Sequence, residues 1–146
     1  MTQEMTENII TRIFNAPRSL VFELWKDPKH LANWYGPKGF TTKSEVDFRV
    51  DGEWKYTMTR ENGPSFTSKV IYQEIVENEK ITYLEENAKV QLFITLTFDD
   101  EGSDKTNFKL KMSSNNEQFT KQMFESAAMG YNSAFNKLEE YLKTLK

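Results

Sequence analysis

Two residue types that often act as catalytic nucleophile or base, cysteine and histidine, are almost absent from this sequence. The 146 residues include no cysteine and a single histidine, His30. A thiol nucleophile and a cysteine-based zinc site are therefore excluded, as is a metal site built from several histidines. His30 belongs to a polar part of an expected helix, and no serine or aspartate is aligned with it as a catalytic triad requires. We therefore expect no catalytic residue among these, and no metal or other cofactor.

The acidic run at 99–104 (DDEGSD) is a second place to look for a metal site. Its carboxylates do not match the ligand spacing of a calcium-binding loop. We interpret this run as a solvated turn.

The more distinctive residues are aromatic: 11 phenylalanines, six tyrosines and three tryptophans. Many alternate with polar residues, so they fall on one face of expected strands. Bulky side chains around a cavity bind an apolar ligand, and the polar tips of tyrosine and tryptophan orient it; alternatively, the same side chains fill a core. The candidate cavity-lining residues are Trp34, Tyr35, Phe40, Phe48, Trp54, Tyr56, Met58, Phe66, Tyr83, Phe98, Phe119, Met123, Ala127 and Tyr131.

Three polar residues interrupt these faces and are candidate anchors for the polar group of a ligand: Ser44, Arg60 and Ser68. A serine hydroxyl at such a position bonds either a ligand or a backbone group or water. An inward Arg60 would need a carboxylate or an anionic ligand, whereas at the end of its strand it would point into solvent.

The elements that position these residues follow from the hydrophobic period. Residues 8–14 predict a strand, and two short helices are expected after it, beginning at Pro17 and at Asp27-Pro28. Residues 34–39 (WYGPKG) could form a hinged flap over a cavity or a helix cap packed on the surface.

Six further strands are expected at 40–50, 54–58, 66–76, 80–85, 90–98 and 106–112. Asp51-Gly52 predicts a tight hairpin between the first two of them. The register of 66–76 and 80–85 stays open, because both segments carry apolar residues on both faces.

A helix of about 30 residues, with apolar side chains every three or four positions, is expected to end the chain. Its last half is aliphatic, whereas its first half carries methionine, alanine and Gly130, which suit a pocket wall better than a sealed core. A close approach to the sheet is the first explanation for Gly130, and a pocket wall or hinge is the second.

Short connections between the strands indicate an antiparallel sheet with one wet face. The C-terminal helix is the only expected element long enough to cover the other face. The sequence therefore predicts an α+β fold of one domain, residues 1–146, in which a curved antiparallel sheet of about seven strands wraps the helix.

Several motifs occur in a recognisable order. In chain order they are 16–25 (APRSLVFELW), Asp27-Pro28 with Leu31, 34–37 (WYGP), 49–54 (RVDGEW), and Gly130-Tyr131 with Leu138 and Leu142. With this order the chain resembles the helix-grip (START-like, SRPBCC) superfamily. Within it, the chain is similar to the group of homologues of the activator of heat-shock-protein-90 ATPase. Tyr35 stands where members often have a second tryptophan, and Asp51 replaces the first of two glycines.

The resemblance implies a deep cavity between sheet and helix, open near the two short helices. It implies small hydrophobic or lipid-like ligands in many relatives, cyclase or hydrolase chemistry in some, and chaperone regulation linked to stress response in others. Our first hypothesis is non-enzymatic binding of such a ligand, and the alternative is a chaperone-linked protein-interaction module. An enzyme ranks third, because it needs an acid, base or nucleophile in the cavity; an inward carboxylate paired with Arg60 or a tyrosine would favour it.

The charge of the chain limits the classes of partner that we expect it to bind. The net charge is −3, and lysines and acidic residues are interspersed. The chain has no basic stripe, so we expect no nucleic-acid partner. No apolar run approaches the ~20 residues that span a bilayer, and residues 1–7 lack a signal-peptide core. We therefore expect a soluble, cytoplasmic protein.

Overall fold

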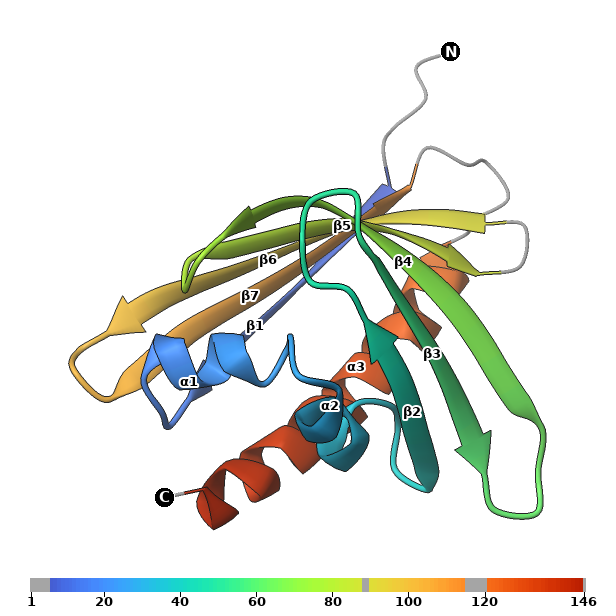
Figure 1. The fold of residues 1–146 in the computed structure, drawn as a ribbon, viewed down its shortest axis with the longest axis horizontal. Coiled ribbons are helices and arrows are strands. Elements are labelled where there is room, and N and C mark those ends of the chain that lie inside the picture. The colour runs from blue at the N-terminus through green and yellow to red at the C-terminus, as the bar shows by residue number, and fades with distance from the viewer. Residues whose placement is uncertain (1–5, 88–89, 115–120, 146) are drawn as a thin grey trace.

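A computed structural model describes residues 6–87, 90–114 and 121–145 of the chain. Seven antiparallel strands form one sheet in the order β1-β7-β6-β5-β4-β3-β2 (Figure 1). The elements are β1 (Thr6–Phe14), α1 (Arg18–Glu23), α2 (Pro28–Trp34), β2 (Phe40–Val46), β3 (Glu53–Arg60), β4 (Ser65–Val76), β5 (Lys80–Asn87), β6 (Val90–Glu101), β7 (Lys105–Ser114) and α3 (Lys121–Thr144).

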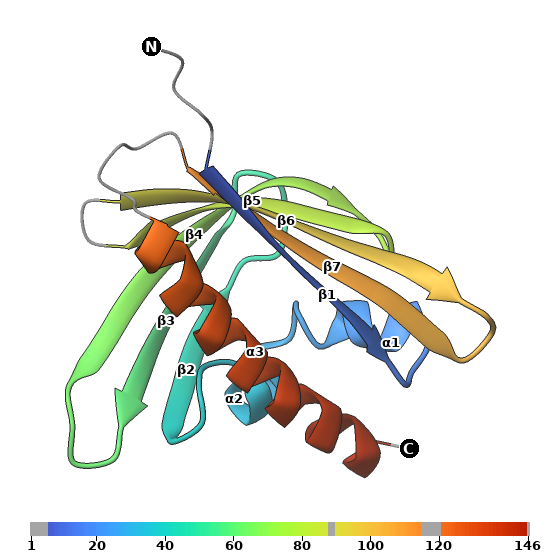
Figure 2. The same ribbon diagram turned by 180° about the vertical axis from the view of Figure 1, so that it is seen from behind.

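The sheet is strongly curved, and α3 crosses its concave side (Figures 1 and 2). Helix α2 packs against both α3 and β2, whereas α1 contacts β6 and β7. Asp27 caps α2, because its carboxylate accepts a hydrogen bond from the backbone N–H of Lys29 at 2.9 Å. The predicted α+β helix-grip arrangement is confirmed.

One sequence-based boundary was wrong. The strand expected over 40–50 ends at Val46, because residues 47–52 fold into a compact loop in which Arg49 N–H bonds Asp47 O and Gly52 N–H bonds Arg49 O. A Cβ on Gly52 would lie 2.1 Å from Asp47 O, so this loop requires glycine there. Within the described residues the C-terminal helix runs over Lys121–Thr144, and the expected start of this helix before residue 121 lies outside the described residues.

The structure also determines the register that the sequence left open. A β-bulge between Tyr72 and Glu74 shifts the pairing of β4 with β5 by one residue. The alternation of β4 therefore breaks at that point. In β5 the inward, buried residues are Ile81, Tyr83 and Glu85, and Leu84 faces outward. A carboxyl group thus points into the space between the sheet and α3.

Aromatic rings fill the interior beneath the C-terminal half of α3. Trp25 stacks on Phe108 with ring centroids 5.7 Å apart, and Phe135 of α3 lies 5.3 Å from Phe108. The Trp34 indole N–H donates to Leu24 O at 3.0 Å and anchors α2 to the end of α1. This region is a packed core, as the aliphatic half of the helix predicted.

Candidate functional site

A cavity of about 180 Å³ lies between the sheet and α3. Its walls come from the loop after α2, from strands β3, β5 and β6, and from α3. The lining residues are Tyr35, Gly36, Pro37, Tyr56, Met58, Glu85, Leu92, Ala127, Gly130, Tyr131 and Ala134. The walls are thus mostly apolar, with three tyrosines and one glutamate as polar groups.

Glu85 is the most unusual residue of this cavity, because its side chain is ionisable and only 4% of the residue is exposed. The Tyr56 hydroxyl donates a hydrogen bond to Oε2 of Glu85, and the Tyr131 hydroxyl lies 3.4 Å from Oε1. Burial raises the pKa of the Glu85 carboxyl above its ordinary value, and the two tyrosine hydrogen bonds oppose that shift. The carboxyl therefore holds its proton to a higher pH than an exposed glutamate does.

The tyrosines around Glu85 are neutral and can donate hydrogen bonds. Burial raises the pKa of Tyr35, Tyr56, Tyr83 and Tyr131 well above 10, and the nearby Glu85 raises each of them further. Their hydroxyl groups therefore keep their protons at neutral pH. Glu85 is thus the group in this cluster whose charge changes most readily.

Two features position the cluster of Glu85 and its neighbouring tyrosines: the alternation of side chains along β5, and one hydrogen bond between β2 and the loop after α2. Glu85 shares the inward face of β5 with Ile81 and Tyr83, and it is opposite Leu92 of β6. Tyr35 follows α2 and is held from β2, because the Thr42 hydroxyl donates to its carbonyl oxygen at 2.6 Å. Trp34 and Tyr35 are both buried and Tyr35 is the C-cap of α2, whereas Lys38 and Gly39 are exposed; residues 35–37 form part of the cavity wall.

Replacing Thr42 by valine should lower the free energy of unfolding by about 1 to 3 kcal/mol, because valine preserves the shape but removes the hydroxyl that satisfies the buried Tyr35 carbonyl. Urea unfolding of the two proteins measures the change. Thr41→Val is the matched control, since Thr41 is exposed on the opposite face of β2 and should change stability by less than about 0.5 kcal/mol. Equal effects of the two substitutions would contradict the assignment.

Five predicted cavity residues do line the cavity: Tyr35, Tyr56, Met58, Ala127 and Tyr131. Trp54 and Tyr83 lie one layer behind them, with Trp54 4.8 Å from Tyr35 and 6.0 Å from Tyr83 between ring centroids. These two rings support the wall without lining it.

The remaining predicted lining residues lie elsewhere. Trp34 and Phe98 belong to the packed core, and Phe48 is half-buried between Phe22 and Tyr72. Phe48 and Phe98 were expected at the cavity because an inward strand face runs past both the cavity and the core, and Trp34 was expected there as part of the 34–39 segment.

At the other end of the molecule, Phe66 is 48% exposed and Met123 is 37% exposed. Phe40 is half-buried, and its ring centroid is 6.2 Å from that of Phe66. Here the strands and α3 extend past the cavity. A side chain on the inward face of a strand is therefore not buried in this region. Phe119 lies outside the described residues.

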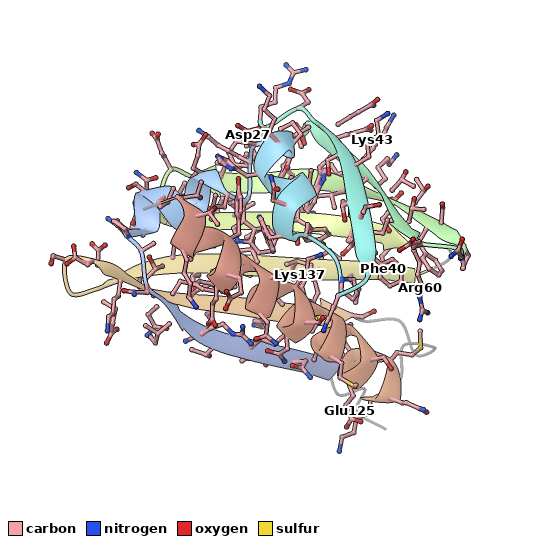
Figure 3. The ribbon with its side chains drawn as sticks, turned by 90° about the horizontal axis from the view of Figure 1, so that it is seen from below. Asp27, Phe40, Lys43, Arg60, Glu125 and Lys137 are labelled. Atoms are coloured by element: carbon pink, nitrogen blue, oxygen red, sulfur yellow. The ribbon has the colours of Figure 1, made fainter. Side chains whose placement is uncertain are left out.

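The three predicted polar anchors have different surroundings. The Ser44 hydroxyl accepts a hydrogen bond from the Trp54 indole at 3.1 Å, so it is already paired. Arg60 is exposed, with its guanidinium 6.0 Å from the centroid of the Phe40 ring; Figure 3 shows both at the ends of their strands. The Ser68 hydroxyl is buried opposite Tyr56 and has no hydrogen-bond partner among the described residues.

Glu85, the buried carboxyl that lines the cavity, was not identified from the sequence. The signal was present, because Glu85 has the same parity as Tyr83, which was expected to face inward. The pair Tyr83-Leu84 obscured it by placing apolar side chains on both faces of the strand. Leu92 and Ala134 are other lining residues that were not proposed, whereas Gly36 and Pro37 belong to the segment proposed as a flap and Gly130 was proposed as a pocket wall only in second place.

Gly130 does not make the close approach to the sheet that was its first explanation. A Cβ there would meet Pro37 Cγ at 3.7 Å, which is an ordinary contact. Gly130 instead forms part of the cavity wall. The second explanation, a pocket wall, is the one that the structure matches.

Other candidate sites can be placed as well. His30 is half-buried, and its Nδ1 is 2.7 Å from the Tyr141 hydroxyl, away from the cavity. In residues 6–87, 90–114 and 121–145, no group of three or more histidine or acidic side chains is placed to hold a metal ion. None of the described helices combines the length and apolarity needed to cross a membrane.

Solved structures share this fold. A protein from Chromobacterium violaceum superposes with a TM-score of 0.83 at 22% identity, covering 92% of this chain and 95% of its own. A protein from Nitrosomonas europaea gives 0.84 at 20% identity, with 94% of both chains covered. A Staphylococcus epidermidis protein gives 0.83 at 21% identity, covering 99% of this chain and 94% of its own. At these identities the likeness is one of fold.

A search of curated proteins found no match. The sequence pattern of one family, described as "Activator of Hsp90 ATPase homolog 1-like protein", matches residues 15–143. That range contains every element from α1 to α3, except the last residue of α3, and every residue that lines the cavity. Together with the helix-grip fold of the solved structures, this match shows that the chain belongs to the family of Activator of Hsp90 ATPase homolog 1-like proteins.

Proposed function

We propose that this protein binds a small, largely hydrophobic molecule in the cavity between the sheet and α3. The observation that carries the proposal is the cavity itself: a space of about 180 Å³ with mostly apolar walls and a few convergent polar groups. Membership of the family supports a ligand-binding or related function.

The size of the cavity limits the ligand. An apolar cavity of about 150 Å³ accepts benzene, whereas drug-sized ligands occupy about 300 to 1,000 Å³. A molecule of one ring, or an aliphatic chain of similar volume, therefore fits the space as it stands. A two-chain lipid would require α3 or the 36–37 loop to move.

Filling the cavity should abolish binding without unfolding the protein. Ala127 lies on the cavity wall, so Ala127→Phe directs a ring into the space. Small aromatic probes such as benzyl alcohol should raise the melting temperature of the wild type, and this rise should be lost in Ala127→Phe. Differential scanning fluorimetry with a series of such probes measures the effect.

Met129 provides the matched control, since it is on the same helix and 74% exposed. Met129→Phe adds a ring in solvent and should keep the response of the wild type. Binding that survives in Ala127→Phe would place the probe elsewhere and contradict the proposal.

A second candidate function is an enzyme that uses Glu85 as its acid or base. The observation in its favour is a buried cavity carboxyl bonded to Tyr56, with a raised pKa. Hydrolysis of 4-nitrophenyl acetate by the wild type, lost in Glu85→Gln but not in Glu86→Gln, would support it. Equal rates in all three proteins would argue against it.

A further inference from the structure

The carboxyl of Glu85 lacks a protein cation. Within the described part of the chain, the ion pairs involve other acidic residues, and none reaches Glu85. Its hydrogen-bond donors among the described residues are the hydroxyl groups of Tyr56 and Tyr131. Buried charges in proteins are ordinarily paired. An ionised Glu85 therefore calls for a positive group from outside the chain.

Tyrosine rings surround the same carboxyl from three elements of the fold. Tyr35, from the loop after α2, lies 5.1 Å from Tyr56 of β3 and 6.4 Å from Tyr131 of α3 between ring centroids. The planes of both pairs are steeply inclined, at 71° and 75°. All three of these tyrosines line the same cavity, and neither pair of rings is parallel. Such aromatic cages bind ammonium groups through cation–π attraction.

The rest of the wall is apolar. Pro37, Met58, Leu92, Ala127 and Ala134 complete the lining. A ligand that fits therefore has one charged end and a compact apolar body.

We propose that the ligand is a small organic cation, an ammonium group on a compact apolar body, and that Glu85 is its counterion within the tyrosine cage. This inference rests on the proposed function, because it names the ligand class of the same cavity. A neutral ligand would be served equally well by a glutamine at position 85, which offers a donor and an acceptor without the cost of burying a charge. Unlike a glutamine amide, a carboxyl can ionise and so offer a negative charge to a positive ligand.

Lys137, a lysine near the cavity, is not the counterion of Glu85. Lys137 of α3 donates its ammonium to Gly36 O at 3.1 Å and lies 3.4 Å from Phe40 O, so it binds the loop backbone. Figure 3 shows Lys137 on α3 beside Phe40, with Arg60 beyond it. The groups that face Glu85 are Tyr35 from the loop after α2, Tyr56 from β3, Tyr83 from its own strand and Tyr131 from α3.

Three probes of similar shape and different charge test the inference: benzylamine, benzyl alcohol and benzoate. Isothermal titration of the wild type at about pH 8 should give a benzylamine affinity about tenfold or more above that of benzyl alcohol, with benzoate weakest. Glu85→Gln should remove this preference while it retains benzyl alcohol binding. Glu86→Gln, on the outward face of β5, should leave it unchanged.

The pH profile provides an independent readout. Binding of a cation by ionised Glu85 releases the proton that burial retains, so benzylamine affinity should rise as the pH increases above the ordinary glutamate pKa of 4.5, while benzyl alcohol affinity stays flat. Tyr56→Phe keeps the ring but removes one hydrogen bond to the carboxylate, so it should move the midpoint of this rise to higher pH. If Glu85→Gln does not fold, this variant still tests the assignment.

The outcomes separate the two proposals. Benzyl alcohol binding as tightly as benzylamine would overturn the cation inference and leave the cavity function standing. Benzylamine binding that Ala127→Phe leaves intact would overturn both, because the probe would lie outside the cavity. No benzylamine binding at millimolar concentration would overturn the cation inference alone if benzyl alcohol still binds.

Discussion

Phe135→Ala should lower the free energy of unfolding by about 3 to 5 kcal/mol, a large part of the stability of a domain this size. Phe135 is fully buried on α3 and joins that helix to the aromatic core of the sheet. Its ring lies within 6.3 Å, between centroids, of five others: Phe14, Trp25, Trp34, Phe108 and Tyr131. Alanine would leave a cavity that these rigid rings cannot close. Urea unfolding measures the loss, and the dependence of the free energy of unfolding on urea concentration should be the same in both proteins.

Met129→Ala is the matched control on the same helix. Met129 is 74% exposed, so its truncation should change the free energy of unfolding by less than about 0.5 kcal/mol. A Phe135→Ala loss no larger than that of the control would show that α3 is not packed on the sheet as described.

Glu85→Gln should make the protein progressively more stable than the wild type as the pH rises. The folded protein raises the pKa of Glu85 above the ordinary value of 4.5, so the proton is lost first in the unfolded chain. Above that value the unfolded state binds fewer protons than the folded state, and the free energy of unfolding falls with pH until the folded-state pKa is passed. The limiting slope is about 1.4 kcal/mol per pH unit for one group.

Glutamine has no proton to lose in this pH range. The free energy of unfolding of the variant therefore does not decrease with pH for this reason. Melting temperatures of both proteins between about pH 4 and about pH 8 measure the difference, which should grow with pH and then level off. Glu86→Gln is the control, since it retains Glu85 and should follow the wild-type profile. Parallel profiles of the wild type and Glu85→Gln would contradict a raised pKa at this site.

The family fold was predictable from the sequence because strands and helices have different hydrophobic periods. The alternation of residues 90–98 and 106–112 predicted two neighbouring strands, which the structure pairs as β6 and β7. The three-to-four residue period that begins at residue 119 predicted the C-terminal helix, which the structure describes as α3 over Lys121–Thr144. Both patterns report which side of one element is apolar, and that information is local.

The cavity residues were only partly predictable. Parity correctly placed Tyr56 and Met58 on an inward face, but it did the same for Phe66, which is half exposed, and for Phe98, which is in the packed core. Inward parity indicates the concave side of the sheet. Whether a side chain there is packed, lines a cavity or extends past α3 depends on the curvature of the sheet and the path of the helix.

The sequence by itself determined the order of the elements, the one-sided sheet and the covering C-terminal helix, because each follows from the period of a continuous segment. Only the tertiary structure decided that Glu85 meets Tyr56 and Tyr131. Those residues lie 29 and 46 positions from it along the chain, and they come together because β3, β5 and α3 converge on one space. The physical reason is that a buried carboxyl is defined by its neighbours, and strand pairing and helix packing choose those neighbours.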